Sequence, residues 1–297
     1  QLSDALVGRT ALHTLFPLSA CEIFSSINED FISRSFSDSW SYKKWDLPSY
    51  PDLMTQMSFP ELYTLRSESL RHDWCNGYLN TMLQRDVKAL MEIDKLARIP
   101  DMLKLLASRN GGVLNEAGLS RDMELNHITT KKYRSLLESL FLTLSLPAWS
   151  ANLGKRLIKS PKIYLGDINI LLYLLNMPLQ DLSLHNPMLW GQIVENFVAI
   201  ELFKQQTFSS VRTSLYYYRT SAGQEIDFLL EGPRGELIAL EVKAKSKVTE
   251  KDFRHIIGLK KVLKDKLVKG FVIYTGNETV SFGPHLFSIP LQALWKR

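Results

Sequence analysis

The chain has 297 residues, of which 45% are hydrophobic and 23% charged, and its formal net charge is +5. This composition is that of a globular protein and excludes a disordered, collagenous or coiled-coil chain. No run of about 18 uncharged apolar residues occurs, so we expect no membrane span and no membrane partner. The length predicts two or three domains, each large enough to bury its own core.

The first residue and the cysteines indicate the origin and compartment of the chain. Gln1 stands where Met would begin a protein, and no basic-then-apolar leader follows it. This favours a fragment or processed product without a secretory signal. Cys21 and Cys75 have no CxxC or CxxxH companion, so neither a disulfide framework nor a structural zinc site is expected. This cysteine pattern favours a reducing cytoplasm.

The positive charge is concentrated in two stretches. Residues 241–270 contain nine Lys and one Arg against four acidic residues, and a smaller basic group lies between Arg121 and Lys162. Clustered basic side chains suit phosphate binding, because neutralising phosphates releases condensed counterions. DNA is therefore the expected partner, although a solvated Lys-rich face without a partner is the commoner explanation of such a stretch.

The first third of the chain has weak patterning followed by a helical stretch. Residues 1–24 are too few for a domain, and residues 25–52 are rich in Ser, Trp and Tyr with weak periodicity. Such a segment is typical of an irregular connection or short helices. Between residues 61 and 96 apolar side chains recur at three- and four-residue steps, and no Pro intervenes before Pro100. This pattern predicts helices.

Residues 99–167 carry the clearest pattern. Three predicted helices, at 99–109, at 115–123 and from Asn126 or Thr129 onward, precede a strand, a basic loop and a second strand. This is the element order of a winged helix, a helix-turn-helix variant that binds DNA. A winged helix used only as a spacer or protein-contact module remains the alternative. The candidate DNA-binding residues are Lys131, Lys132 and Arg134 on the third helix and Lys155, Arg156 and Lys159 on the wing, residues 155–162.

The last part of the chain predicts a mixed sheet flanked by helices. After a buried helix at 168–177, an amphipathic helix at 191–205 precedes three strands, a helix and further strands. The expected strands cover 214–219, 225–231, 236–244 and 270–274, with an edge strand near 286–290, and the helix between them covers 249–263. The fold class is therefore a multidomain α+β protein.

Acidic and basic side chains occur in register on two of these apolar strands. Glu241 and Lys243 are two residues apart and share a strand face, and a hairpin would bring Asp227 beside Glu241. Two carboxylates with a backbone carbonyl suit Mg²⁺, and Glu195 on the preceding helix adds a further carboxylate. The Lys243 ammonium would orient an attacking water or stabilise charge on a scissile phosphate. Because burying unpaired carboxylates is costly, these carboxylates must have a partner. The alternative is therefore a cluster that is ion-paired with Lys243 and its neighbours and has no catalytic role.

The order of helix Glu, Asp and then Glu-x-Lys resembles the PD-(D/E)xK restriction-endonuclease-like fold. It is represented here by Glu195, Asp227, Glu241 and Lys243. A longer series of segments, including LVGRTALHTLFPLS, LLASRNGGVLN, LGKRLIKSPKIYLGD, ENFVAIEL and IALEVKA, is similar to prokaryotic AAA+-type ATP-binding proteins with a C-terminal domain of unknown function. The resemblance implies a remnant of the AAA+ core at 1–24, a helical lid-like region at 25–98, a winged helix at 99–167 and a nuclease-like domain at 168–297.

The chain departs from that family in lacking a G-x-x-x-x-G-K-[ST] phosphate-binding loop. We therefore expect no ATPase activity from this sequence, and ATP binding and homo-oligomerisation only through an intact AAA+ parent. Two functions follow from the resemblance and the residues. The first is a Mg²⁺-dependent DNA-binding or DNA-cleaving module. The second is a non-catalytic module that docks a nucleic acid or protein to an ATPase.

Overall fold

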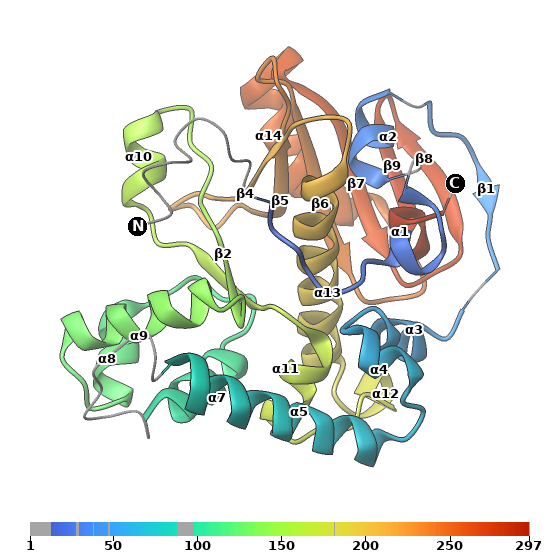
Figure 1. Cartoon of the computed structure of the whole chain (residues 1–297). Helices are drawn as coiled ribbons and strands as arrows, with labels where there is room; N and C mark the ends of the chain where they lie inside the picture. The colour runs from blue at the N-terminus through green and yellow to red at the C-terminus, as the bar shows by residue number, and fades with distance from the viewer. Residues whose placement is uncertain are drawn as a thin grey trace, which may run out of the picture.

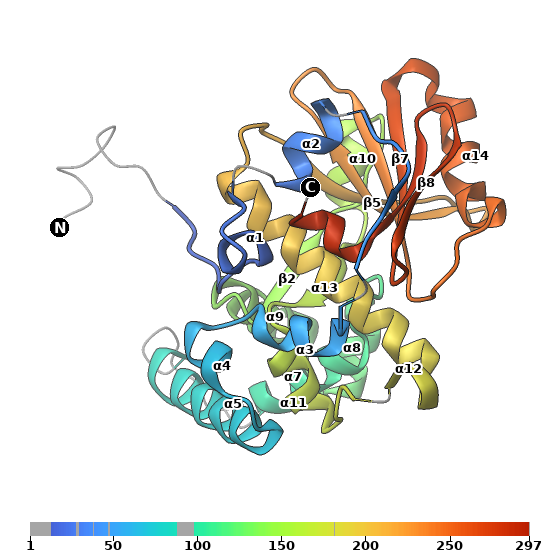
Figure 2. The ribbon, with the colours of Figure 1, turned by 90° about the vertical axis from the view of Figure 1, so that its right-hand side faces the viewer.

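The fold is a mixed α+β arrangement, as the sequence predicts. The computed structural model describes residues 13–27, 30–37, 39–46, 48–87, 98–180 and 182–296. Its strands form a seven-stranded mixed sheet and a separate two-stranded sheet. In Figures 1 and 2 the large sheet occupies the upper part of the molecule, above most helices of the first half of the chain. No helix in the described ranges is long and apolar enough to cross a membrane.

The large sheet is built mainly from the C-terminal third of the chain. Its strands are β1 (Lys43–Lys44), β4 (Ser214–Arg219), β5 (Glu225–Glu231), β6 (Leu237–Lys243), β7 (Leu267–Tyr274), β8 (Glu278–Gly283) and β9 (Leu286–Pro290). They lie in the order β1-β8-β9-β7-β6-β5-β4, with β6, β7 and β9 parallel and the other neighbours antiparallel. The parallel β6–β7 pair requires a crossover, which contains helix α14 (Arg254–Leu263).

One strand lies elsewhere than expected. The strand near residues 286–290, predicted at the edge of the sheet, is β9, and it pairs with β7 on one side and β8 on the other. The sequence pattern did not predict β8. Most of its side chains are partly exposed, and apart from Thr279, Val280 and Phe282 the strand has only small or charged residues, so it lacks a clear apolar alternation. β8 in turn pairs with β1 from the distant N-terminal part, which moves the edge outward by two strands.

Helices cover both faces of the large sheet, as Figure 2 shows. Helix α13 (Pro187–Phe208) buries Phe197 and Leu202 against one face. Helix α14 buries Ile256 and Leu259 against the other. Removing each such side chain from water stabilises the fold by about 1.5–3 kcal/mol. Because α13 packs along the sheet, its polar residues Asn196, Glu201, Lys204 and Gln205 are carried into the interior.

The three helices and two strands expected between residues 99 and 167 are confirmed as elements. They are α7 (Ile99–Ser108), α8 (Glu116–Asp122), α9 (His127–Ser139), β2 (Thr143–Leu146) and β3 (Lys162–Leu165). Asn115 and Asn126 cap α8 and α9 by accepting hydrogen bonds from backbone N–H groups of the first turn. The connection between β2 and β3 contains a helix, α10 (Leu153–Ile158), where the sequence predicted a basic loop.

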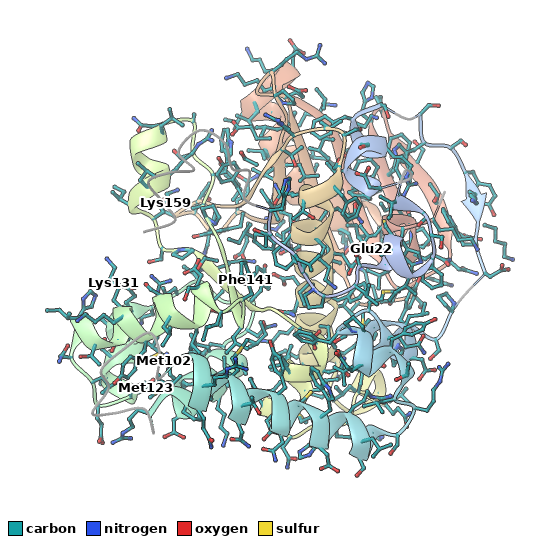
Figure 3. All side chains as sticks on the ribbon, in the orientation of Figure 1. Glu22, Met102, Met123, Lys131, Phe141 and Lys159 are labelled. Carbon is teal, nitrogen blue, oxygen red and sulfur yellow. The ribbon has the colours of Figure 1, made fainter. Side chains whose placement is uncertain are left out.

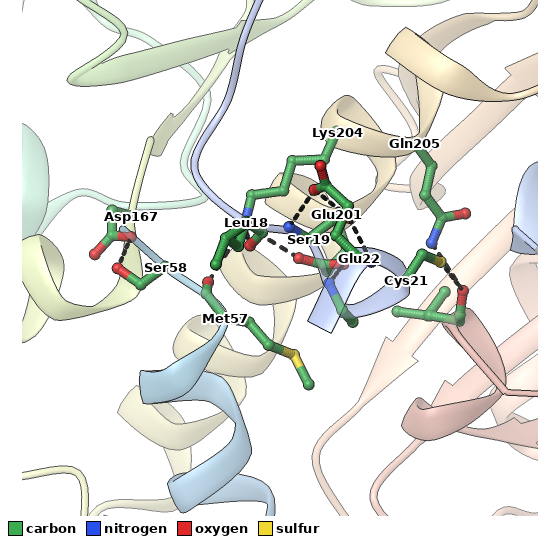
Figure 4. Close-up of polar contacts among 12 residues, drawn as sticks. Leu18, Ser19, Cys21, Glu22, Met57, Ser58, Asp167, Glu201, Lys204 and Gln205 are labelled. Atoms are coloured by element: carbon green, nitrogen blue, oxygen red, sulfur yellow. Dashed lines mark hydrogen bonds and ion pairs between the residues drawn. The ribbon is translucent and has the colours of Figure 1, made fainter. Parts of the chain in front are cut away.

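The N-terminal segment packs against the C-terminal part of the chain. Figure 4 shows residues 18–22 and Met57 facing Glu201 and Lys204 of α13. The Lys204 ammonium donates to the carbonyl oxygens of Leu18 and Met57 at 2.8 and 3.3 Å. Both ends of the described chain therefore share one core. The short helices of this segment are α1 (Ala20–Ile23) and α2 (Phe31–Ser37).

The helical stretch expected between residues 61 and 96 is confirmed as far as residue 87, and residues 88–97 lie outside the described part. Residues 1–12, the greater part of the expected AAA+ remnant, also lie outside it, so the domain boundaries stay predictions. The helices of the lower part are α3 (Tyr50–Gln56), α4 (Pro60–Thr64), α5 (Glu68–Met82), a π-helical turn (Leu83–Val87), α11 (Ile168–Leu175) and α12 (Leu182–His185).

Candidate functional site

Asp227 lies at an irregularity in strand β5. The pairing of β4 with β5 shifts register between Tyr216 and Tyr218, which places a β-bulge beside Asp227. Bulges redirect side chains and are frequent next to functional sites. The Asp227 carboxylate accepts a hydrogen bond from the backbone N–H of Val242 at 2.8 Å. Asp227 is thereby fixed next to the segment of β6 that carries Glu241 and Lys243, as the hairpin argument predicts.

Glu241 is a buried carboxylate that is only half satisfied. Its side chain is 5% exposed, and one oxygen accepts from the Lys243 ammonium at 2.8 Å. The other oxygen, Oε1, has no hydrogen-bond partner among the described residues. Burial and the neighbouring Asp227 charge raise the pKa of Glu241 to about 8, although Lys243 opposes the shift. An unpaired buried carboxylate oxygen is costly, so this atom marks a place for a further cation or donor.

Glu195 reaches the same region from helix α13. One of its oxygens accepts from the Tyr164 hydroxyl at 2.7 Å and from the Lys162 ammonium at 3.1 Å. Burial and then the Asp227 charge raise the pKa of Glu195 to about 7, while Lys162 and Tyr164 lower it. Glu201, six residues later on α13, faces the N-terminal segment instead, so only Glu195 of these two glutamates joins the cluster.

Lys162 is a member of this cluster that sequence reasoning missed. Its side chain is 4% exposed, and its ammonium lies 2.8 Å from Glu225, 3.1 Å from Glu195 and 3.7 Å from Asp227. Burial lowers the pKa of Lys162, but the three carboxylates outweigh it and the net shift is upward. The sequence placed Lys162 at the end of a solvated basic wing. A signal was present, since this lysine begins the apolar strand KIYL, in which every residue is buried.

The cluster has more acid than base. Four carboxylates face two ammonium groups and the Arg219 guanidinium, which lies 3.7 Å from Glu225. The fully ionised cluster therefore carries a net charge of −1, which a bound cation would offset. The upward pKa shifts of two of the carboxyl groups, caused by burial and by a neighbouring carboxylate, reflect the same excess. The carboxylates are Glu195, Glu225, Asp227 and Glu241, and the ammonium groups are Lys162 and Lys243.

The carboxylates do not all converge on one point. Among the residues that the structure describes, no group of three or more His, Cys, Asp or Glu side chains could hold a metal ion. Glu195, Glu225 and Asp227 are instead paired with the Lys162 ammonium. Asp227 and Glu241 remain as an adjacent pair with a free carboxylate oxygen. Such a pair suits Mg²⁺, which is commonly bound by one or two carboxylates, with waters and substrate phosphate completing its shell.

A cleft of about 640 Å³ adjoins the cluster. It is lined by Lys162, Glu195, Glu225 and Asp227 and by residues of the stretch 109–122 in the α7–α8 region. Clefts of this size bury small ligands or single nucleotides. The unit expected to be a winged helix therefore lines the approach to the candidate site, with Arg121 in its wall.

The candidate DNA-binding residues fall into two groups. Lys131 and Lys132 on α9 and Lys159 after α10 are exposed, and Figure 3 shows Lys131 and Lys159 projecting from the same side of the molecule. Arg134 instead pairs with Glu116 and Glu138, and Arg156 forms a two-pronged ion pair with Glu231. These two arginines connect elements within the fold. The side chain of Lys155 lies outside the described part.

Comparisons with known proteins find two families of unknown function and two distant relatives. Residues 48–181 match the family described as "Domain of unknown function (DUF8612)", and residues 190–294 match "Domain of unknown function (DUF4143)". The uncharacterized proteins Mb2031c of Mycobacterium bovis and Rv2008c of Mycobacterium tuberculosis are each 31% identical to the chain over 172 residues. That alignment covers 58% of this chain and 38% of each relative.

The chain therefore spans less than half the length of these relatives. No solved structure matches it significantly. The part of the chain that carries Glu195, Asp227, Glu241 and Lys243 is similar to a domain family that is often found in AAA-ATPase-associated proteins.

Proposed function

We propose that the C-terminal part of the chain is a PD-(D/E)xK-like module that hydrolyses phosphodiester bonds in DNA with the help of Mg²⁺. The observation that carries this proposal is the buried Glu241 oxygen without a hydrogen-bond partner, next to Asp227 and Lys243. A purely structural ion-pair cluster would be expected to satisfy such an atom.

Each residue has a distinct role in this proposal. Asp227 and Glu241 would hold the ion, and Glu195 would hold the lysine and tyrosine of strand β3. A bound Mg²⁺ would polarise a phosphate oxygen and lower the pKa of a water molecule. The Lys243 ammonium, already beside Glu241, orients the attacking water and stabilises charge that develops on the scissile phosphate.

The exposed lysines support the choice of DNA as the substrate. Lys131, Lys132 and Lys159 offer phosphate contacts outside the cleft. In this proposal the unit from residue 99 to 167 acts as a winged helix that positions the DNA, and an ATPase region of a longer parent protein would bind ATP and assemble the oligomer.

Cleavage of labelled single-stranded and duplex DNA, with and without Mg²⁺ or Mn²⁺, tests the proposal. We expect metal-dependent cutting that falls by about 10²–10³-fold in Asp227→Asn and in Lys243→Ala, because each removes a group that acts on the transition state. The exposed residues Asp265 and Lys104 supply matched controls, and Asp265→Asn and Lys104→Ala should cut normally. Equal cutting by all four variants would rule out this site.

A second candidate is a docking module that binds nucleic acid or protein without cleaving it. The observation in its favour is the commitment of Lys162 to three carboxylates, which removes much of the cluster's negative charge. This candidate predicts DNA binding whose affinity falls steeply with salt, no cutting under any metal condition, and no change in binding for Asp227→Asn.

A further inference from the structure

The ammonium of Lys162 lies where a cation site would be expected. Oxygens of Glu225 and Glu195 approach it at 2.8 and 3.1 Å, and an Asp227 oxygen lies at 3.7 Å. These carboxylates come from helix α13 and strand β5, whereas the lysine comes from β3, a strand of the separate two-stranded sheet. The positive charge is thus supplied by one unit of the fold and the negative charges by another.

The surroundings keep this ammonium in place. The Lys162 side chain is 96% buried, its ammonium lies 5.9 Å from the centre of the Tyr217 ring, and the Tyr164 hydroxyl shares the Glu195 oxygen. A buried ammonium needs several oxygen partners to offset its lost hydration, and the three carboxylates provide them. Without the ammonium, the Glu225 and Glu195 oxygens that approach it at 2.8 and 3.1 Å would lose this partner, and a hard cation takes such carboxylate oxygens.

We propose that Lys162 takes the position that a second divalent ion would occupy, so that the protein binds a single ion, at Asp227 and Glu241. The assignment rests on the proposed function for the identity of that single ion. Asp227 is the residue common to both positions, since it lies beside Lys162 through one oxygen and beside the β6 backbone through the other. Two-metal sites place their ions a few ångströms apart around a shared carboxylate, and here one ion is replaced by a tethered ammonium.

The substrate requirement follows from this arrangement. Without a second ion, the phosphate that enters the cleft has to meet fixed positive charge from the protein. Lys162 and Arg121 both line the cleft, but the Lys162 ammonium is already paired with three carboxylates. The site therefore suits a DNA phosphate held between the Arg121 guanidinium and one metal ion.

Titration of the full chain with Mn²⁺ by calorimetry tests the assignment. We expect one ion per chain for the wild type and two for Lys162→Ala, with the additional ion lost again in Lys162→Ala combined with Glu225→Gln. Lys104→Ala, which removes an exposed lysine on α7, should bind one ion. Two ions in the wild type, or the same number of ions in Lys162→Ala as in the wild type, would overturn the assignment.

If Lys162→Ala fails to fold, Glu195→Gln tests the assignment of Lys162 instead. The single ion should remain, with its affinity changed by less than about threefold, because Glu195 contacts the lysine rather than the ion. Loss of that ion would overturn the assignment. The proposed function fails separately. If the wild type binds no ion and Lys162→Ala gains one through Glu225, the metal site at Asp227 and Glu241 is rejected, while the position of Lys162 as a cation substitute stands.

Discussion

Helix α13 carries two glutamates, the partly buried Glu195 and the buried Glu201, whose surroundings differ sharply. Glu201 is fully buried, and one oxygen accepts from the backbone N–H of Ala20 at 2.9 Å while the other pairs with Lys204 at 3.2 Å. Lys204 in turn donates to two backbone carbonyls. Glu195, six residues earlier, belongs to a cluster with excess negative charge and a carboxylate oxygen, on Glu241, that lacks a partner.

The difference distinguishes a charge pair that stabilises the fold from a charge cluster that can bind a ligand. Around Glu201 one acid meets one base, and the remaining donors and acceptors are backbone groups of the N-terminal segment. Such a network stabilises a particular packing and has no capacity left for a ligand. Around Glu195, Asp227 and Glu241 the acids outnumber the bases, which destabilises the fold but provides affinity for a cation. Function is expected where stability has been given up.

The largest effect on stability should come from the structural pair. Lys204→Met leaves the Glu201 carboxylate buried without its cation and two carbonyl groups without a donor. We expect a loss of about 3–5 kcal/mol in the free energy of unfolding, measured by urea denaturation, with Mn²⁺ binding by the folded fraction unchanged. Lys104→Met on the surface should cost less than about 0.5 kcal/mol. Equal losses in the two variants would show that Lys204 has no structural role.

Removing a charge from the candidate site should raise the stability of the fold, whereas removing Lys204 lowers it. Because the pKa of Glu241 is raised to about 8 in the fold, against about 4.3 when unfolded, the folded state retains a proton that the unfolded state releases. Stability of the metal-free protein therefore falls as pH rises from about 4.3 to 8. Glu241→Gln removes this penalty, so it should be more stable than the wild type by about 1–3 kcal/mol at pH 8.5 and nearly equal to it at pH 4.

Thermal unfolding in the presence of a chelator measures the effect. Added Mg²⁺ should stabilise the wild type and leave Glu241→Gln unchanged. If Glu241→Gln is less stable than the wild type at pH 8.5, the Glu241 carboxylate is well solvated or paired. The contrast drawn with the paired Glu201 would then be wrong.

Local patterns were sufficient to predict many of the elements. The helices α8 and α9 follow from amphipathic spacing and from Asn115 and Asn126, whose capping side chains act within one turn. The shared strand face of Glu241 and Lys243 likewise follows from alternation along a single strand. Each of these inferences depends on residues less than about ten positions apart.

Long-range packing determined what the sequence did not predict. Lys162 is 63 positions from Glu225 and only the contact between β3 and the large sheet makes it a site residue. Arg156 was expected at DNA, but Glu231, 75 positions away, accepts hydrogen bonds from both of its terminal NH2 groups. The pairing of β1 with β8 is of the same kind. A charged residue in an apolar run therefore signals burial without identifying its partner.

The smallest expected effect is on the reactivity of Cys21. This thiol reports how tightly the Glu201–Lys204 pair holds the N-terminal segment against α13. Burial, with smaller contributions from Glu201 and Asp30, raises the pKa of the Cys21 thiol to about 12, and only the thiolate reacts with alkylating reagents. Native wild-type protein should therefore show almost no labelling of Cys21 by iodoacetamide at pH 8, as followed by mass spectrometry. Lys204→Met should label faster than the wild type under native conditions, because opening of the junction becomes more frequent, whereas Lys162→Ala should label at the wild-type rate. Faster labelling in Lys162→Ala alone would mean that the candidate site, and not the Glu201–Lys204 pair, secures the N-terminal segment.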